Sequence, residues 1–279
     1  MDELNNLQSI GLTEEELTLL NNALEEANSD NFTLPKNSPS LLVDDSTSRF
    51  SSAVWFEEAR KQTITLAGLG GIGSYVNFLL ARLKPASITI YDDDNVDATN
   101  LSGQLYSTDC VGSSKVFSAA NIARGFADYH STICKYGWFT TASAPTPIMI
   151  CGFDNMDARQ VFFNVWRHYV EKLEPEERKN CLYIDGRLAA EEFQVFCITG
   201  EDTYLMNKYK KEWLFSDEVA ENTVCSYKQT SFCANMIASV MVNLFVNFVS
   251  NKCDTVIKRE LPFMTSYDAI NMLFRTRNV

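Results

Sequence analysis

The sequence predicts an α/β protein whose doubly wound, mainly parallel sheet carries helices on both faces. Two observations support this fold class. From residue 64 onward, short apolar runs alternate with longer segments of helical periodicity, and a glycine-rich turn joins the first apolar run to the first helix. Alternation of this kind is typical of βαβ units, which bind ligands at the carboxyl ends of their strands.

The alternation assigns the elements in order along the chain. Strands are expected at residues 64–67, 87–91, 146–151, 181–184 and 193–198, and helices at residues 72–83, 114–127, 155–173 and 231–249. Residues 201–228 are polar and are expected to run irregularly over the ligand-binding edge. Residues 1–45 are expected to form a polar N-terminal segment with one helix at residues 13–27 and a linker, ahead of a domain at residues 46–279.

Composition excludes some functions. The 279 residues are 46% hydrophobic, which suffices for one large core, and the net charge of −12 argues against a nucleic-acid partner. The acidic start MDELNNLQ does not resemble a signal peptide, and polar residues interrupt the most apolar run, so we expect a cytoplasmic protein with no membrane partner. The eight cysteines form no C-x-x-C pair, which favours reduced thiols over disulfides or a zinc knuckle.

The turn in ITLAGLGGIGS contains Gly68, Gly70, Gly71 and Gly73. Three of them spell G-x-G-x-x-G between an apolar run and a helix, as in a Rossmann-like nucleotide-binding unit. The N–H groups and positive dipole end of such a helix suit a phosphate. The alternative is that these glycines only let strand and helix pack closely.

The second expected strand ends in SITIYDDD, and Asp92 stands 92 − 73 = 19 residues after the last glycine. An acidic residue at this place accepts hydrogen bonds from ribose hydroxyls. Up to this point, an NAD-dependent enzyme and an ATP-binding enzyme fit equally well.

The stretch DDDNVDATNLSGQLYSTDCVGSSKV separates these two readings. It resembles the ThiF/HesA/MoeB and ubiquitin-activating-enzyme superfamily, whose motif is D-x-D-x-V-x-x-x-N-L-x-R-Q followed by V-G-x-x-K. A second motif, D-N-x-x-x-R-x-x-x-N, is similar to CGFDNMDARQVFFN, and RELPFMTSYD is similar to the closing strand of the family. The resemblance covers roughly residues 45 to 275.

The resemblance implies a role for each matching residue in an ATP pocket. Asp92 would bind the ribose, Asn100 and Gln104 would lie on the phosphate side, and Lys115 would contact the triphosphate. Asp94 matches the second aspartate of the motif, although a solvated loop charge is the simpler interpretation. Lys115 has an alternative as well, as an exposed residue in the first turn of a helix.

The second motif implies the metal site. Asp154 would be the carboxylate associated with Mg²⁺, with Asn155, Arg159 and Asn164 around it. Acyl adenylation needs positive groups along the triphosphate, a carboxylate for Mg²⁺ and donors for the charge that develops at the α-phosphate. ATP and Mg²⁺ are therefore the expected cofactors.

One position departs from the family. Gly103 stands where the N-L-x-R-Q motif carries an arginine toward the phosphates. Arg49, upstream of the first strand, is the candidate substitute, because the family has an arginine-bearing segment there that reaches across a homodimer. The alternative is that Arg49 is a solvated charge in the linker. We also expect the protein to form a homodimer.

Two further residues have open alternatives. Cys225 lies in a segment that resembles the place where many family members carry an acyl-accepting cysteine, and Lys228 or the following helix start would lower its pKa. A spectator thiol is the alternative. Arg187, in YIDGR, is expected at a strand end, in an ordinary turn ion pair or lining the substrate groove.

Three functions remain open at this stage. The leading hypothesis is an adenylyltransferase acting on the C-terminal carboxylate of a small ubiquitin-like or sulfur-carrier protein, with thioester formation as an optional second step. The second is an ATP-binding scaffold or sensor that has lost turnover, which Gly103 favours. The third is an NAD(P)-dependent oxidoreductase, which the motifs after Asp92 do not favour.

Overall fold

A computed structural model describes residues 45–215 and 229–278 of the chain. The chain divides into two compact units, Met1–Asp45 and Ser46–Val279, and nearly all described residues belong to the second. The helix expected at residues 13–27, Cys225 and Lys228 all lie outside the described residues.

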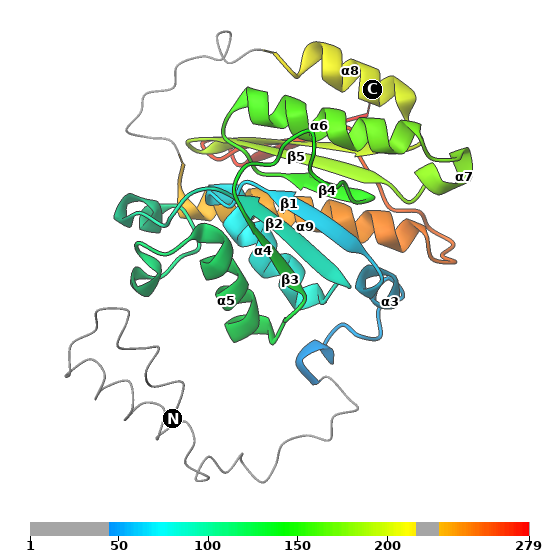
Figure 1. The fold of residues 1–279 in the computed structure, drawn as a ribbon. Coiled ribbons are helices and arrows are strands. Elements are labelled where there is room, and N and C mark those ends of the chain that lie inside the picture. Colours follow the sequence, from blue (N-terminus) through cyan, green and yellow to red (C-terminus); the bar gives the residue numbers. More distant parts are fainter. Residues whose placement is uncertain (1–44, 216–228, 279) are drawn as a thin grey trace, which may run out of the picture. The chain divides into compact units, whose positions relative to one another are not determined.

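One eight-stranded sheet organises the second unit, with the strand order β3-β2-β1-β4-β5-β6-β7-β8 (Figure 1). The strands are β1 Thr63–Ala67, β2 Ser87–Asp92, β3 Thr132–Tyr136, β4 Ile148–Cys151, β5 Leu182–Ala189, β6 Glu192–Thr199, β7 Met264–Asp268 and β8 Leu273–Arg277. The pairs from β3 to β5 are parallel, and those from β5 to β8 are antiparallel. The predicted α/β class is confirmed, and the antiparallel half is an addition to it.

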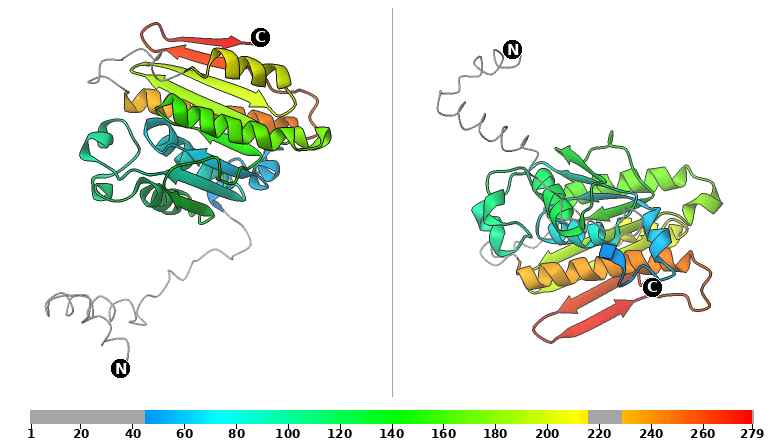
Figure 2. Two further views of the ribbon diagram at one scale, coloured as in Figure 1. Left: turned by 45° about the horizontal axis from the view of Figure 1, so that its top comes forward. Right: turned by 90° about the horizontal axis from the view of Figure 1, so that it is seen from below.

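Helices cover both faces of the sheet (Figures 1 and 2). One face carries α3 Phe56–Arg60, α4 Gly71–Leu83, α5 Lys115–Ala127 and α9 Ser231–Asn251, and the other carries α6 Met156–Glu171 and α8 Thr203–Glu212. Shorter elements are α7 Pro175–Arg178, η2 Asp45–Thr47, η3 Ala98–Ser102 and η4 Thr108–Cys110. The strands thus separate two apolar cores, as expected for strands buried on both faces.

Helix α9 is long and apolar enough to cross a membrane by length and composition. In the structure, 61% of its most apolar stretch is buried, and it packs against α4, β5 and β6. A helix apolar on most of its surface is also what the core of a large soluble domain requires. The burial of α9 accounts for its composition.

The short helices α3 and α7 were not predicted, and four other elements also differ from the sequence expectation. The edge strand β3 was not predicted, because its half-exposed residues do not form a continuous apolar run. Strand β8 also lies at an edge with all five residues exposed. Strand β5 continues to Ala189, so Arg187 lies within a strand and not after its end.

The fourth difference is α8, which occupies part of the segment expected to be irregular. Asp202 caps this helix by accepting a hydrogen bond from the backbone N–H of Leu205, at 2.8 Å. Met206 and Tyr209 are its buried residues, and the rest is polar enough to hide the helical periodicity. The seven described cysteines are free.

Candidate functional site

The glycine turn connects β1 to α4 at the carboxyl end of the strand. Gly68 has a φ of +81°, and a Cβ there would lie 2.7 Å from backbone atoms of Gly152 and Phe153, so only glycine fits. A Cβ on Gly73 would overlap the carbonyl oxygen of Gly68. Gly70 is the N-cap of α4 and Gly71 its first residue. The turn therefore needs glycine for close packing, and neither the N-cap nor the first residue of α4 carries a side chain.

Asp92 ends β2 beside this turn. Its Oδ2 accepts a hydrogen bond from the backbone N–H of Leu69 at 2.6 Å, and its Oδ1 accepts one from that of Asp94 at 3.0 Å. Burial raises the pKa of Asp92 above the ordinary value, although the charge of Lys115 and the two backbone hydrogen bonds oppose this shift. The carboxylate thus lies at the glycine turn, where the sequence predicted a ribose ligand.

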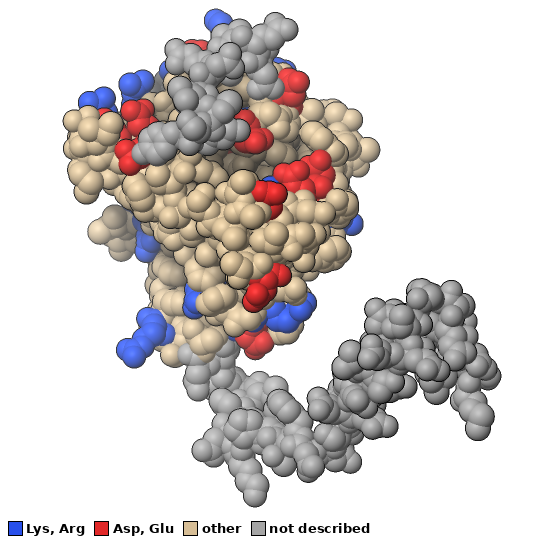
Figure 3. Space-filling model, turned by 90° about the vertical axis from the view of Figure 1, so that its left-hand side faces the viewer, with Lys and Arg blue, Asp and Glu red and all other residues tan. Residues whose placement is uncertain are grey.

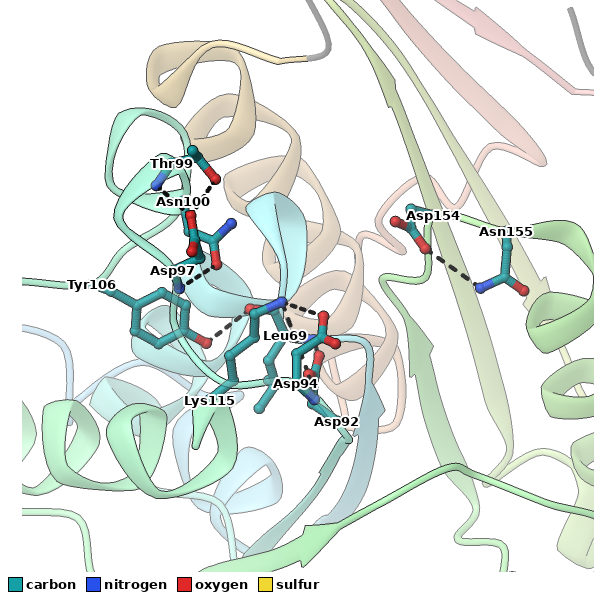
Figure 4. A network of polar contacts seen from close by, with 10 residues as sticks. All are labelled: Leu69, Asp92, Asp94, Asp97, Thr99, Asn100, Tyr106, Lys115, Asp154 and Asn155. Carbon is teal, nitrogen blue, oxygen red and sulfur yellow. Dashed lines mark hydrogen bonds and ion pairs between the residues drawn. The ribbon is translucent and has the colours of Figure 1, made fainter. Parts of the chain in front are cut away.

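Lys115, the first residue of α5, points toward the same carboxylates (Figure 4). Its Nζ lies 2.7 Å from Oδ2 of Asp94 and 4.0 Å from Oδ1 of Asp92. The Lys115 side chain is 7% exposed, so the alternative of an exposed first-turn residue is wrong, whereas the Asp94 side chain is 64% exposed. A buried ammonium group thus lies beside the glycine turn.

Residues 95–114 form a loop that is tied to the turn. The Tyr106 hydroxyl donates to the Leu69 carbonyl at 2.8 Å, and the Leu105 N–H donates to the Ser74 hydroxyl at 3.0 Å. Within the loop, Asn100 Oδ1 accepts a hydrogen bond from the Asp97 N–H in a capping box. These contacts fix where Asn100 and Gln104 stand relative to α4.

Gln104 has an unsatisfied oxygen. Its Oε1 is buried and has no hydrogen-bond partner among the residues that the structure describes. Its Nε2 would lie 3.9 Å from a Cβ placed on Gly70. A buried acceptor without a partner is costly, so Gln104 is a candidate to receive a donor from a bound ligand.

Asp154 follows β4 at the same edge of the sheet and is exposed. Asn155 is the N-cap of α6, with Oδ1 accepting from the Ala158 N–H at 2.8 Å and Nδ2 donating to Asp154 at 3.4 Å. In Figure 4 this pair stands apart from the group around Lys115. Asn164 is exposed on α6, about 13 Å of helix beyond Asn155, so the structure does not gather it with Asp154.

Arg159 points into the protein from α6. Its guanidinium pairs with Asp185 and donates to the carbonyls of Gly186 and Phe153. Since Phe153 directly precedes Asp154, Arg159 holds the backbone that carries the exposed carboxylate. The nucleotide-binding role of Arg159 stays a prediction, and the contacts described for it are all within the protein.

Asp185 is fully buried and is shared between three groups. Besides Arg159, it accepts hydrogen bonds from Arg187 Nε at 2.8 Å and from the Tyr209 hydroxyl at 2.7 Å. Burial alone would raise the pKa of Asp185, but the two guanidinium groups and their hydrogen bonds lower it below its ordinary value. The ion pair predicted for Arg187 is present, within a strand.

The remaining predicted residues lie elsewhere. Arg49 is exposed in a turn between η2 and α3, ahead of the amino end of β1, so the chain does not bring it to the glycine turn at the carboxyl end. Gly103 is buried in the loop beside α4. The predicted catalytic role of Arg49 stays a prediction that needs a second copy of the chain.

Sequence reasoning missed four residues at this edge of the sheet. Tyr106, Asp185, Tyr209 and Gln229 were not singled out. The sequence YID offered a signal for Asp185, because an acidic residue there directly follows an apolar run. Nothing local marks Tyr209 or Gln229, because each reaches its partners through the tertiary fold.

The electrostatics of this edge favour a bound cation together with an anion. Ligand oxygens of Asp92, Asp93 and Asp94 lie within 4.8 Å of one another, and acidic side chains stand on the face at the left of Figure 1 (Figure 3). Lys115 and the first turn of α4 supply the positive potential beside them. A nucleotide phosphate accompanied by a divalent metal ion suits such a mixture of charges.

Comparison with known proteins finds a family model that matches most of the chain. The ThiF family model matches residues 47–279. Ubiquitin-like modifier-activating enzyme 5 of Drosophila pseudoobscura pseudoobscura is 28% identical over 123 residues, which are 37% of this chain and 30% of the relative. The Caenorhabditis elegans protein of the same name is 33% identical over 64 residues, 23% of this chain and 15% of the relative. The alignments therefore span less than a third of these relatives.

Solved structures share the fold over nearly the whole chain. PaaA has a TM-score of 0.64 at 14% identity and covers 99% of this chain and 85% of its own. Escherichia coli MccB, crystallised with ATP, has a TM-score of 0.59 at 14% identity, with 98% and 80% covered. At this level of identity, the likeness establishes the architecture alone.

Proposed function

This chain belongs to the ThiF family, and from that premise we propose that it adenylates the C-terminal carboxylate of a small ubiquitin-like or sulfur-carrier protein with ATP and Mg²⁺. The named relatives are ubiquitin-like modifier-activating enzymes, and MccB was crystallised with ATP. Both support a nucleotide-dependent activation of a protein or peptide.

One observation carries the proposal: the carboxylate of Asp92 is bonded to the backbone of the glycine turn and faces the ammonium group of Lys115. The residue proposed to bind the ribose thereby lies close to a helix N-terminus and a cation. The glycine N-cap and glycine first residue of α4 and the unsatisfied oxygen of Gln104 fit a nucleotide at this place.

The chemistry is an attack on the α-phosphorus of ATP. A carboxylate oxygen of the partner forms the new P–O bond, and the bond to the bridging oxygen breaks as pyrophosphate leaves. Lys115 would stabilise negative charge on the phosphates, and the N–H groups of α4 would do the same. Mg²⁺, which we propose Asp154 would hold, supplies further neutralisation of that charge.

Two finer elements belong to the same proposal. Arg49 would complete the pocket of a partner subunit in a homodimer, because within its own chain it lies beyond the other end of β1. Cys225 would receive the activated acyl group as a thioester after adenylation. The adenylation step does not depend on that thiol.

Pyrophosphate exchange tests the proposal. Labelled pyrophosphate should enter ATP when the enzyme is given its ubiquitin-like partner from the same genome. Asp154→Ala should abolish this exchange, since it removes the proposed metal carboxylate. Asp128→Asn is the matched control, because Asp128 is an exposed carboxylate at the far end of α5 and asparagine tolerates its positive φ.

Two outcomes would favour the other candidates. ATP binding without exchange for any candidate partner would support the scaffold, which the glycine at position 103 favours. Stabilisation by NAD and not by ATP would support an oxidoreductase. Exchange that survives Asp154→Ala would remove the proposed role of that carboxylate while leaving adenylation in place.

A further inference from the structure

The space beside Gly103 is filled by another side chain. A Cβ on Gly103 would lie 2.9 Å from both Cγ and Nε2 of Gln229 and 3.2 Å from its Cδ. These distances are shorter than ordinary van der Waals contact, so residue 103 has no room for a side chain while Gln229 stands there. The family motif has an arginine at position 103, and in this chain the carboxamide of Gln229 occupies the space beside that position.

The same carboxamide lies against the first turn of α4. A Cβ on Gly71 would overlap Oε1 of Gln229 and would lie 3.0 Å from its Nε2. Gly71 and Gly103 come from different segments, and both leave open the volume that Gln229 uses. One neutral polar side chain thus reaches the helix N-terminus proposed to bind phosphate.

Two regular elements hold Gln229 in this position. Its backbone forms a parallel bridge with Ala190, the residue that follows β5. Directly after it, Thr230 caps α9 by accepting a hydrogen bond from the Cys233 N–H at 3.4 Å. The end of β5 and the start of α9 therefore place the carboxamide at the nucleotide site.

We propose that Gln229 is a ligand of the ATP phosphates in this chain and that position 103 is glycine because Gln229 takes the space of a side chain there. This inference rests on the proposed function, since it assigns a residue to the same pocket. The Nε2 group has two N–H donors for phosphate oxygens, whereas the full positive charge comes from Lys115. The carboxamide supplies the hydrogen bonds of the absent arginine without its charge.

Calorimetry of ATP·Mg²⁺ binding to the full chain tests the ligand role. Gln229→Ala should weaken binding about tenfold, because it removes hydrogen bonds to a charged group, while the affinity for adenosine stays the same. Gln62→Ala is the control, since Gln62 bonds to Glu58 beyond the opposite end of β1. Equal loss of ATP and adenosine affinity, no loss, or tighter ATP binding by Gln229→Ala would each overturn the proposal.

The steric part has its own test, which needs no nucleotide. Gly103→Ala should lower the thermal midpoint of the free protein, and Gly103→Ala with Gln229→Ala should recover most of that loss. Additive effects of the two substitutions would overturn the claim that Gln229 excludes a side chain at position 103.

The two proposals fail in different ways. If the unchanged chain does not bind ATP·Mg²⁺, the proposed function fails and the ligand role of Gln229 fails with it. If the unchanged chain binds ATP·Mg²⁺ and Gln229→Ala binds it equally well, only the ligand role fails.

Discussion

Two groups of charged side chains, one around Asp185 on β5 and one around Asp92 at the end of β2, carry opposite excess charge. The buried cluster consists of Asp185, Arg159, Arg187 and Tyr209, and the edge cluster of Asp92, Asp94 and Lys115. In the buried cluster, two guanidinium groups and a hydroxyl surround one carboxylate. In the edge cluster, one ammonium group faces two carboxylates, of which one is well exposed.

The pKa values of the two buried acids move in opposite directions. That of Asp185 is lowered, because its two arginines outweigh the cost of burial, and that of Asp92 is raised, because Lys115 and two backbone N–H groups do not. A carboxylate that is fully satisfied holds the fold together. A carboxylate buried without enough partners gains from a further donor, such as a ribose hydroxyl, which is consistent with the binding role proposed for the edge cluster.

The largest effect is expected from Asp185→Asn. This change leaves two buried guanidinium groups without their counter-charge, and we expect a loss of about 3–5 kcal/mol in the free energy of unfolding at pH 7. Urea unfolding measures it, with Asp128→Asn as the exposed control. A loss similar to that of the control would show that the buried cluster does not stabilise the fold.

We also expect the stability difference between the unchanged chain and Asp185→Asn to depend on pH. Because the folded-state pKa of Asp185 lies below the ordinary value of about 3.9, its stabilising contribution is present above that value and is lost as the pH falls further. The stability difference between the unchanged chain and Asp185→Asn should therefore be constant near neutral pH, where the carboxyl group is ionised in both the folded and the unfolded chain, and should shrink below about pH 4. If the stability difference stayed constant below about pH 4, the lowered pKa of Asp185 would be contradicted.

An intermediate effect is expected from Lys115→Met, which removes the cation of the edge cluster. ATP·Mg²⁺ binding should weaken by about 1.5–3 kcal/mol, the range for hydrogen bonds to charged groups, and adenosine binding should change less. Equilibrium dialysis measures both affinities. Lys61→Met is the control, because Lys61 is an exposed lysine beyond the opposite end of β1. Equal losses for the two lysines would mean that net charge alone is responsible.

The smallest effect is expected from Asp94→Asn, the same chemical change as Asp185→Asn in the other cluster. Its side chain is 64% exposed, so the free energy of unfolding should fall by less than about 1 kcal/mol. Urea unfolding under identical conditions gives the comparison. If Asp94→Asn lowered the free energy of unfolding as much as Asp185→Asn, solvent exposure would not explain the different stability contributions of the two clusters.

Local sequence patterns were enough to locate four of the five strands that pair in parallel and the candidate site residues at the glycine turn. Apolar runs followed by helical periodicity located β1, β2, β4 and β5 together with α4 to α6, because strands buried on both faces are continuously apolar. The glycine spacing and Asp92 were also readable, since a close turn and an acid at a strand end are local requirements. Lys115 was singled out as well, through its place in a motif.

The edge strands and several side-chain environments depended on long-range packing. The edge strands β3 and β8 owe their conformation to pairing with a neighbour and not to an apolar run of their own. The burial of Lys115 and the direction of the Arg159 side chain depend on residues more than 20 positions away in the sequence. Lys115 pairs with Asp94, and Arg159 points toward Asp185. Gln229 reaches Gly71 and Gly103 across more than a hundred residues of chain, and no local pattern records such a contact, because it is formed only when β5 and α9 have packed.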